Sequence, residues 1–190
     1  MIRYDKKIFQ EIEVTAQISS FCGEGNVEEW HVMLHVQAGG FFSEQMERLH
    51  QAESLLMGMQ EWKDVKCVAR RYFLSDSANQ YREMSLRQAD AVSVIQQPPL
   101  DGSKVALWLY LTRGMEVVQE HGTTVCQSNG YTHLWCMGMQ HPEGDSAVQT
   151  TALLDGYEES LSQFGANVAD NCIRTWFFVR DVDTHYAGLV

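Results

Sequence analysis

The chain of 190 residues is 45% hydrophobic and 11% aromatic, which is enough apolar material to bury a core and excludes a disordered protein. Its formal net charge of −11 comes without a basic patch, so we expect no nucleic-acid partner. No stretch approaches the ~18 apolar residues of a membrane-spanning helix, and residues 1–10 are charged without an apolar run, so we expect no signal sequence. The five cysteines lack the tight spacing of a disulfide framework, so we expect a protein of the reducing cytoplasm. Since no apolar stretch is long enough to span a membrane, we expect no membrane partner.

Two strands and a helix are predicted first. Apolar and polar side chains alternate over residues 8–20 and again over 30–36, which is the period of half-buried strands, and a glycine-containing turn separates them. From Ser43 to Met59, apolar residues recur at spacings of three and four, which predicts a helix with Ser43 as its N-cap.

The next residues complete a compact unit. We expect a strand, a helix and two more strands, in the order 65–74, Ser75 to about Arg87, 91–95 and 105–111. The resulting order is β-β-α-β-α-β-β, an α+β unit with helices on one face of a mixed sheet. Thr112-Arg113-Gly114 reads as a junction, so the first domain is predicted to span residues 1–113.

The second half repeats most of this order. Its predicted elements are a strand over 115–126 with a kink at Gly122, a strand over 131–139, a helix over 149–164, a strand over 172–181, and a short helix that carries Tyr186. Three landmarks of the first half return 105 positions later: Cys67, Asp76 and Tyr81 become Cys172, Asp181 and Tyr186. We interpret residues 114–190 as a truncated second copy, and we expect its last two strands to follow Val190 in a longer protein.

Three short segments of the second half carry a resemblance to a known family. Met137-Gly138-Met139-Gln140-His141-Pro142 resembles a Ser-Gly-Gln-x-Pro segment, Gln149-Thr150-Thr151-Ala152-Leu153-Leu154 resembles a glutamine-containing helix, and Val179-Arg180-Asp181 resembles a strand exit. In this order and spacing, they resemble the RidA family, also called YjgF. Two such units in one chain, with Arg-Thr-Trp at 174–176, look most like the chorismatase group.

The resemblance implies a chorismate-mutase-like fold and a hydrolase or lyase that acts on a small carboxylated metabolite. RidA proteins hydrolyse enamines and imines, whereas chorismatases act on the enolpyruvyl group of chorismate, and neither implies a cofactor. It also implies a homo-oligomer, with a trimer favoured, whose chemistry lies in the second unit while the first serves as a scaffold. Nucleic-acid cleavage has been attached to the family too, but the net charge of −11 disfavours it here.

The chain departs from the family where chemistry is expected. RidA deaminases use an arginine just before the late strand pair, where it can hold a substrate carboxylate. The first unit has Ala89-Asp90 at that place, and the corresponding part of the second unit lies beyond Val190. We therefore assign no catalytic residue and expect residues 1–190 to be inactive by themselves. The alternative is a non-catalytic module for ligand binding or assembly.

Four residues are candidates for substrate binding. Arg174 lies among apolar neighbours and could clamp a carboxylate, or it could be a solvated residue on the outer face of a strand. Gly138 could let a ligand approach the backbone, or it could mark a bulge or a close crossing of the chain. Tyr131 and Trp135 could line the same cleft, although aromatic residues in strands usually belong to a core.

A metal site is not expected. Cys126, His133, Cys136 and His141 contain the right kinds of ligand, but their spacing matches no standard zinc motif. His133 and Cys136 also have opposite parity, so a strand would project them to opposite faces.

Overall fold

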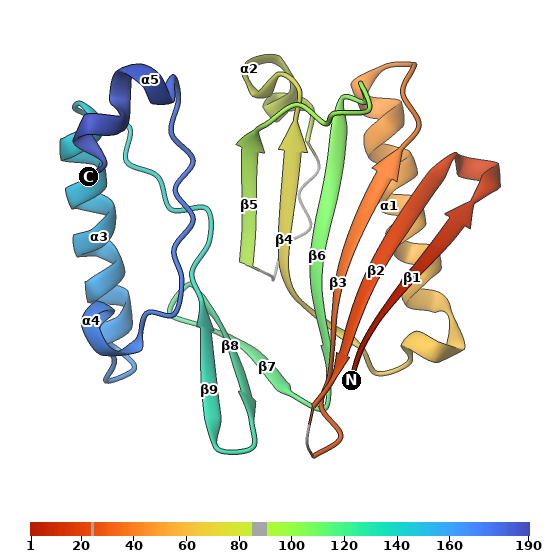
Figure 1. Cartoon of the computed structure of the whole chain (residues 1–190), viewed down its shortest axis with the longest axis horizontal. Helices are drawn as coiled ribbons and strands as arrows, with labels where there is room; N and C mark the ends of the chain where they lie inside the picture. The colour runs from red at the N-terminus through yellow and green to blue at the C-terminus, as the bar shows by residue number, and fades with distance from the viewer. Residues whose placement is uncertain (24, 85–90) are drawn as a thin grey trace.

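The computed structural model describes residues 1–23, 25–84 and 91–190, and these form an α+β structure with a mixed sheet, as predicted (Figure 1). The strands are β1 Ile2–Phe9, β2 Val14–Cys22, β3 Glu28–Val36, β4 Lys66–Leu74, β5 Ala91–Gln96, β6 Val105–Arg113, β7 Glu116–Glu120, β8 Thr123–Ser128 and β9 Tyr131–Trp135. The α-helices are α1 Phe42–Gly58, α2 Ser77–Gln80, α3 Ser146–Ser162, α4 Val168–Asn171 and α5 Val182–His185. Four 3₁₀ turns are η1 Gln10–Ile12, η2 Gln60–Trp62, η3 Tyr81–Glu83 and η4 Tyr186–Gly188.

The first half of the chain forms a six-stranded sheet in the order β1-β2-β3-β6-β4-β5. Among the described strands of this sheet, β4 and β5 are parallel neighbours and the other pairs are antiparallel. Helix α1 covers one face of this sheet (Figure 1), because Met46, Leu49, Ala52 and Leu56 form an apolar stripe at helical spacing. That stripe meets the inward side chains of the strands in the main core.

A buried ion pair joins α1 to β4. The Arg70 guanidinium donates from Nε and Nη2 to Oε1 of Glu53, at 3.1 and 2.6 Å. Burial opposes the charge on Arg70, yet nearby groups that include Glu53 leave its pKa raised above the ordinary arginine value. The pair therefore fixes the helix on the sheet with a charged contact inside the core.

The second half adds a three-stranded sheet in the order β7-β8-β9, followed by helices. A second apolar cluster joins it to the face of the large sheet that α1 leaves open, and its buried members are Val27, Val68, Ala69, Ala91, Tyr110, Met115 and Cys126. Gly114 lies at the junction with φ +83°, and a Cβ there would lie 2.6 Å from the carbonyl oxygen of Asn26. Only glycine fits at this position, because the chain that leaves β6 passes close to the backbone of the turn before β3.

The first half differs from the prediction at three places. The sheet gains an unpredicted edge strand, β1, and β2 begins only at Val14, after the turn η1. Ser43 is not the N-cap of α1; instead the Glu44 carboxylate accepts the backbone N–H of Phe41. Helix α2 begins within a few residues of the predicted start at Ser75 and is capped by Asp76, but it spans a single turn; Arg87, where we expected its end, lies outside the described residues.

The second half differs more. The predicted strand over 115–126 is two strands, because the chain reverses at His121 and Gly122, which both have positive φ. The strand predicted over 131–139 ends at Trp135. Residues 172–179, predicted as a strand, form none: within the described chain, residues 173–179 make no backbone–backbone hydrogen bond. We call residues 172–179 the unpaired segment.

Helix α3 confirms the predicted helix within a few residues, and its N-cap is Asp145, whose Oδ1 accepts the backbone N–H groups of Ala147 and Val148. The unpaired segment runs from α4 to α5 between α3 and β5 (Figure 1). Among the described residues, no helix has the length and apolar character needed to cross a membrane.

Candidate functional site

The site begins with a row of side chains across the open face of the large sheet. Arg71 on β4 lies directly opposite Trp108 on β6 and Ser93 on β5. Directly opposite residues in neighbouring strands project to the same face. Since Arg70 and Tyr72 point toward α1, Arg71 points away from that helix into the space before the second half.

Arg71 is held between aromatic rings. Its Cζ lies 5.5 Å from the ring centroid of Trp108, 5.1 Å from that of Trp176 and 5.0 Å from that of Phe178. These are cation–π distances, and they connect β4 to the unpaired segment. Burial lowers the pKa of this half-buried guanidinium, but it stays charged at neutral pH.

No acidic side chain of the described residues neutralises Arg71, whose buried Nε has no hydrogen-bond partner there. The other inward or half-buried arginines of the first half are paired: Arg48 with Glu13, Arg70 with Glu53 and Arg113 with Glu28. Buried donors without partners are uncommon in native proteins. Arg71 therefore keeps a buried donor without a partner, and its positive charge has no acidic partner among the described residues.

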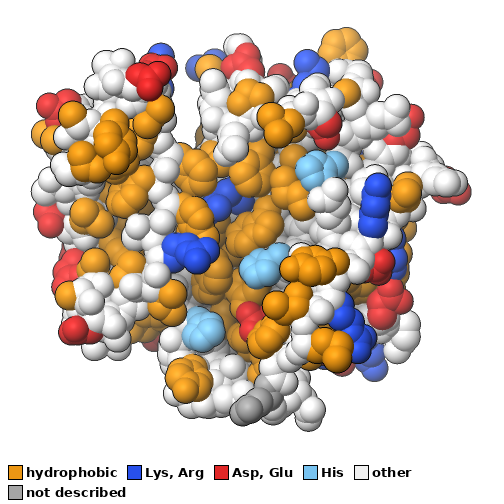
Figure 2. All heavy atoms as spheres, viewed as in Figure 1, with side chains coloured by type: hydrophobic (Ala, Val, Ile, Leu, Met, Phe, Trp, Pro, Cys, Tyr) orange, Lys and Arg blue, Asp and Glu red, His pale blue; other side chains and the backbone are white. Residues whose placement is uncertain are grey.

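The unpaired segment supplies the opposite wall. Trp176 and Phe178 contact Arg71, and the Arg174 guanidinium lies with its Cζ 5.4 Å from the same Trp176 ring. Figure 2 shows the hollow between the halves, with hydrophobic and basic side chains on its walls. We call this group of side chains in mutual contact the arginine–aromatic cleft; its residues are Arg71, Trp108, Trp135, Arg174, Trp176 and Phe178.

A second aromatic group continues the cleft along β3 and β6. The His31 ring stacks on Trp108 and Tyr110, with centroids 5.6 and 5.1 Å apart, and Trp135 of β9 lies 4.8 Å from Tyr110. The Tyr110 hydroxyl donates to Glu29, and burial together with this carboxylate raises the pKa of Tyr110. Burial lowers the pKa of His31, so its imidazole is neutral at pH 7.

The structure brings two of the four predicted binding residues together. Arg174 and Trp135 belong to the cleft, connected through Trp176, Arg71 and Trp108. Tyr131 is 71% exposed at the start of β9 and is not one of the cleft residues.

Gly138 has the structural role that we gave as its alternative. Its φ is +71°, and a Cβ there would lie 2.5 Å from the carbonyl oxygen of Val92 on β5. The chain after β9 therefore crosses close to the backbone of the large sheet at this residue, which excludes any side chain.

Sequence reasoning missed Arg71 and Trp108, the central residues of the cleft. In the sequence, Arg71 is only the second of two adjacent arginines, and a strand projects these two side chains to opposite faces. One signal in the sequence could have identified Arg71. Adjacent residues of a strand point to opposite faces, so if Arg70 faces the helix that covers the sheet, Arg71 must face the other side. Ala89 and Asp90, where the family has its arginine, lie outside the described residues.

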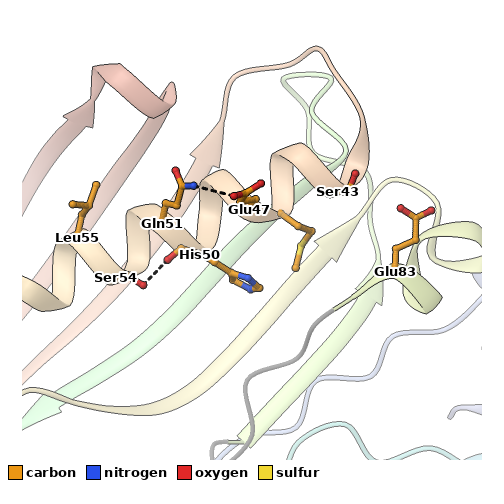
Figure 3. Close-up of a pocket in the computed structure, with 8 residues that line it drawn as sticks. Ser43, Glu47, His50, Gln51, Ser54, Leu55 and Glu83 are labelled. Carbon is orange, nitrogen blue, oxygen red and sulfur yellow. Dashed lines mark hydrogen bonds between the residues drawn. The ribbon is translucent and has the colours of Figure 1, made fainter.

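A hollow of about 780 Å³ lies elsewhere, between α1 and η3 (Figure 3). Its walls are mainly polar side chains of α1, together with Glu83 of η3. Gln51 donates to Glu47, and the Ser54 hydroxyl donates to the His50 carbonyl oxygen, so these groups satisfy one another. We prefer the arginine–aromatic cleft because it holds an uncompensated charge against aromatic rings.

The described residues contain no group of three or more His, Cys, Asp or Glu side chains placed to hold a metal ion. Cys126 is buried, and burial, together with Glu29, raises the pKa of its thiol to about 11. This thiol is therefore protonated at neutral pH and is a poor nucleophile. The cleft would therefore bind a ligand through the charge of its guanidinium groups and through stacking on its aromatic rings.

Comparison with models of known protein families gives no match, and comparison with curated proteins gives none either.

Proposed function

We propose that the arginine–aromatic cleft binds a small carboxylated metabolite. The observation that carries this proposal is Arg71, a half-buried guanidinium among three rings whose Nε lacks a partner within the described chain. A carboxylate supplies the charge and the acceptor oxygens that a guanidinium fork requires, often through two parallel hydrogen bonds. The rings give the carbon skeleton of the ligand apolar surfaces on which to lie.

We further propose that the chain is a tandem protein of RidA-like units, residues 1–113 and 114–190. The spacing and length of the elements support this proposal. The helix α5 and the turn η4 begin 105 positions after α2 and η3, and α3 has the same length as α1, 17 residues. The unpaired segment then corresponds to β4, and it would pair with two strands outside residues 1–190. The cleft would then serve a hydrolase or lyase reaction on the carboxylated metabolite.

A homo-trimer is the assembly that we propose for this protein. Exposed apolar side chains gather on the face of β1 and β2 that α1 does not cover, namely Tyr4, Ile8 and Phe21. Exposed apolar patches of this kind often mark interfaces. Light scattering at rising concentration tests this assembly, and a mass that stays at one chain throughout would contradict it.

Binding is tested by titrating the 190-residue protein with propionate and with its neutral analogue propionamide. The cleft contains Trp108, Trp135 and Trp176, so tryptophan fluorescence reports on occupancy. Propionate should change the fluorescence saturably and propionamide should not. Arg71→Gln should weaken propionate binding by about tenfold or more, because a charge-assisted hydrogen bond is lost. Equal responses to both probes, or none to propionate, would refute the proposal.

A non-catalytic binding module is the second candidate. This candidate is favoured because the side chains that contact Arg71 are aromatic rings, which can hold a ligand but cannot donate or accept a proton in a reaction. Ammonia release from a freshly generated 2-imino acid separates the two, because a binding module holds the ligand without releasing ammonia above the spontaneous rate.

A further inference from the structure

Two guanidinium groups share one indole ring in the cleft. The Cζ atoms of Arg71 and Arg174 lie 5.1 and 5.4 Å from the centroid of Trp176. Arg71 comes from β4 of the first half and Arg174 from the unpaired segment of the second, 103 positions further along the chain. The ring is therefore a common platform for two positive charges from opposite walls of the cleft.

Neither charge is balanced by an acidic side chain within the described residues. No ion pair joins Arg71 or Arg174 to a carboxylate there, whereas Arg180, at the end of the unpaired segment, lies 3.3 Å from Asp181. Glu29, whose carboxylate lies beside Tyr110, already accepts the hydroxyl of that residue. In a chain of net charge −11, two neighbouring cations without acidic partners indicate a local preference for an anion.

We propose that the ligand of the cleft is a compact dianion, whose two negative groups are held by Arg71 and Arg174 across Trp176. This inference rests on the proposed carboxylate binding and adds its charge and the second binding residue. A single carboxylate would occupy Arg71 and leave Arg174 in solvent, whereas a second anionic group also engages Arg174. Two carboxylates on one small skeleton and a phosphate group have this chemistry in common.

The proposal also gives the first half a role in binding. Its β4 supplies the partly desolvated cation, and the second half supplies the exposed one, so neither half contains the site alone. A bound dianion would connect the sheet to the unpaired segment, which is otherwise joined to Arg71 through ring contacts.

Three probes test the charge of the ligand: propionate, succinate and inorganic phosphate, titrated into the 190-residue protein at pH 7.5 and constant ionic strength. Succinate or phosphate should bind about tenfold more tightly than propionate, because one more charge-assisted contact forms. Whichever of the two binds more tightly identifies the source of the second charge. The preference should weaken as salt is added, since Arg174 is exposed.

Two variants assign the preference to one residue. Arg174→Gln should reduce dianion binding to about the level of propionate and leave propionate binding within about twofold. Arg180→Gln removes the same charge from the end of the same segment, and should leave all three affinities unchanged.

Two results would overturn the inference. Propionate binding with no gain for succinate or phosphate would refute the dianion and leave the proposed carboxylate function intact. A dianion preference that survives Arg174→Gln would refute the role of that residue. Failure of all three probes would remove the proposed function itself.

Discussion

The strand β4 and the unpaired segment have the same sequence pattern but different structures. Val68 on β4 is fully buried, whereas Ile173, 105 positions later, is 92% exposed. β4 lies between β6 and β5 and bonds to both, while residues 173–179 have no backbone partner in the described chain. An apolar run of this kind therefore becomes a strand only where neighbouring strands complete its hydrogen bonds.

The two long helices show the opposite behaviour. α1 and α3 both have 17 residues, although α1 buries seven of them and α3 buries only Leu161. A helix satisfies its backbone groups internally and needs only a good cap, which Asp145 provides for α3. Helices thus form in both halves, while the core forms where the sheet is complete.

The largest expected difference between the halves concerns Glu53 and Glu158, which are 105 positions apart on α1 and α3. Glu53→Ala leaves Arg70 charged in the core and should cost about 3–5 kcal/mol of the free energy of unfolding. Within the described chain, Glu158 accepts the backbone N–H of Val168 at the surface, so Glu158→Ala should cost about 1 kcal/mol or less. Urea denaturation measures both, and similar costs would show that the halves are equally packed.

A smaller contrast is expected for two leucines at the same spacing. Leu49 is fully buried on α1, and Leu49→Ala should destabilise the protein by about 2–5 kcal/mol, because it leaves a cavity. Leu154 on α3 is 36% exposed, and Leu154→Ala should cost about 1 kcal/mol. If thermal unfolding gives Leu154→Ala the larger effect, then α3 is covered in solution by something that residues 1–190 do not supply.

The smallest effect is local and concerns hydrogen exchange. Backbone amides of β4 should exchange slowly, since they bond to strands on both sides, whereas those of residues 173–179 should exchange close to the rate of an unstructured peptide. Mass spectrometry of peptides from the two segments provides the comparison within one sample. Slow exchange in residues 173–179 would mean that the segment has strand partners in solution, as in an oligomer.

Much of the first half could be predicted from the sequence because its patterns are strong and its elements have partners. The helix from Ser43 to Met59 and the strands over 65–74, 91–95 and 105–111 are confirmed within a few residues. The edge strand β1 could not be predicted, because it is charged and almost wholly exposed, and only its pairing with β2 makes it a strand.

The candidate site was less predictable than the fold. Arg174 and Trp135 were identified from their types and positions, and the structure places both in the cleft. Arg71 was not, because a charged residue in a strand has functional meaning only when its face and its neighbours across the sheet are known.

The sequence by itself determined the two long helices and the alternation that buries one face of β2 and β3, since these follow from local geometry and apolar spacing. Tertiary structure alone decided that residues 172–179 stay unpaired and that Arg71 meets Trp176. Both outcomes depend on contacts between residues more than a hundred positions apart, which no local pattern encodes.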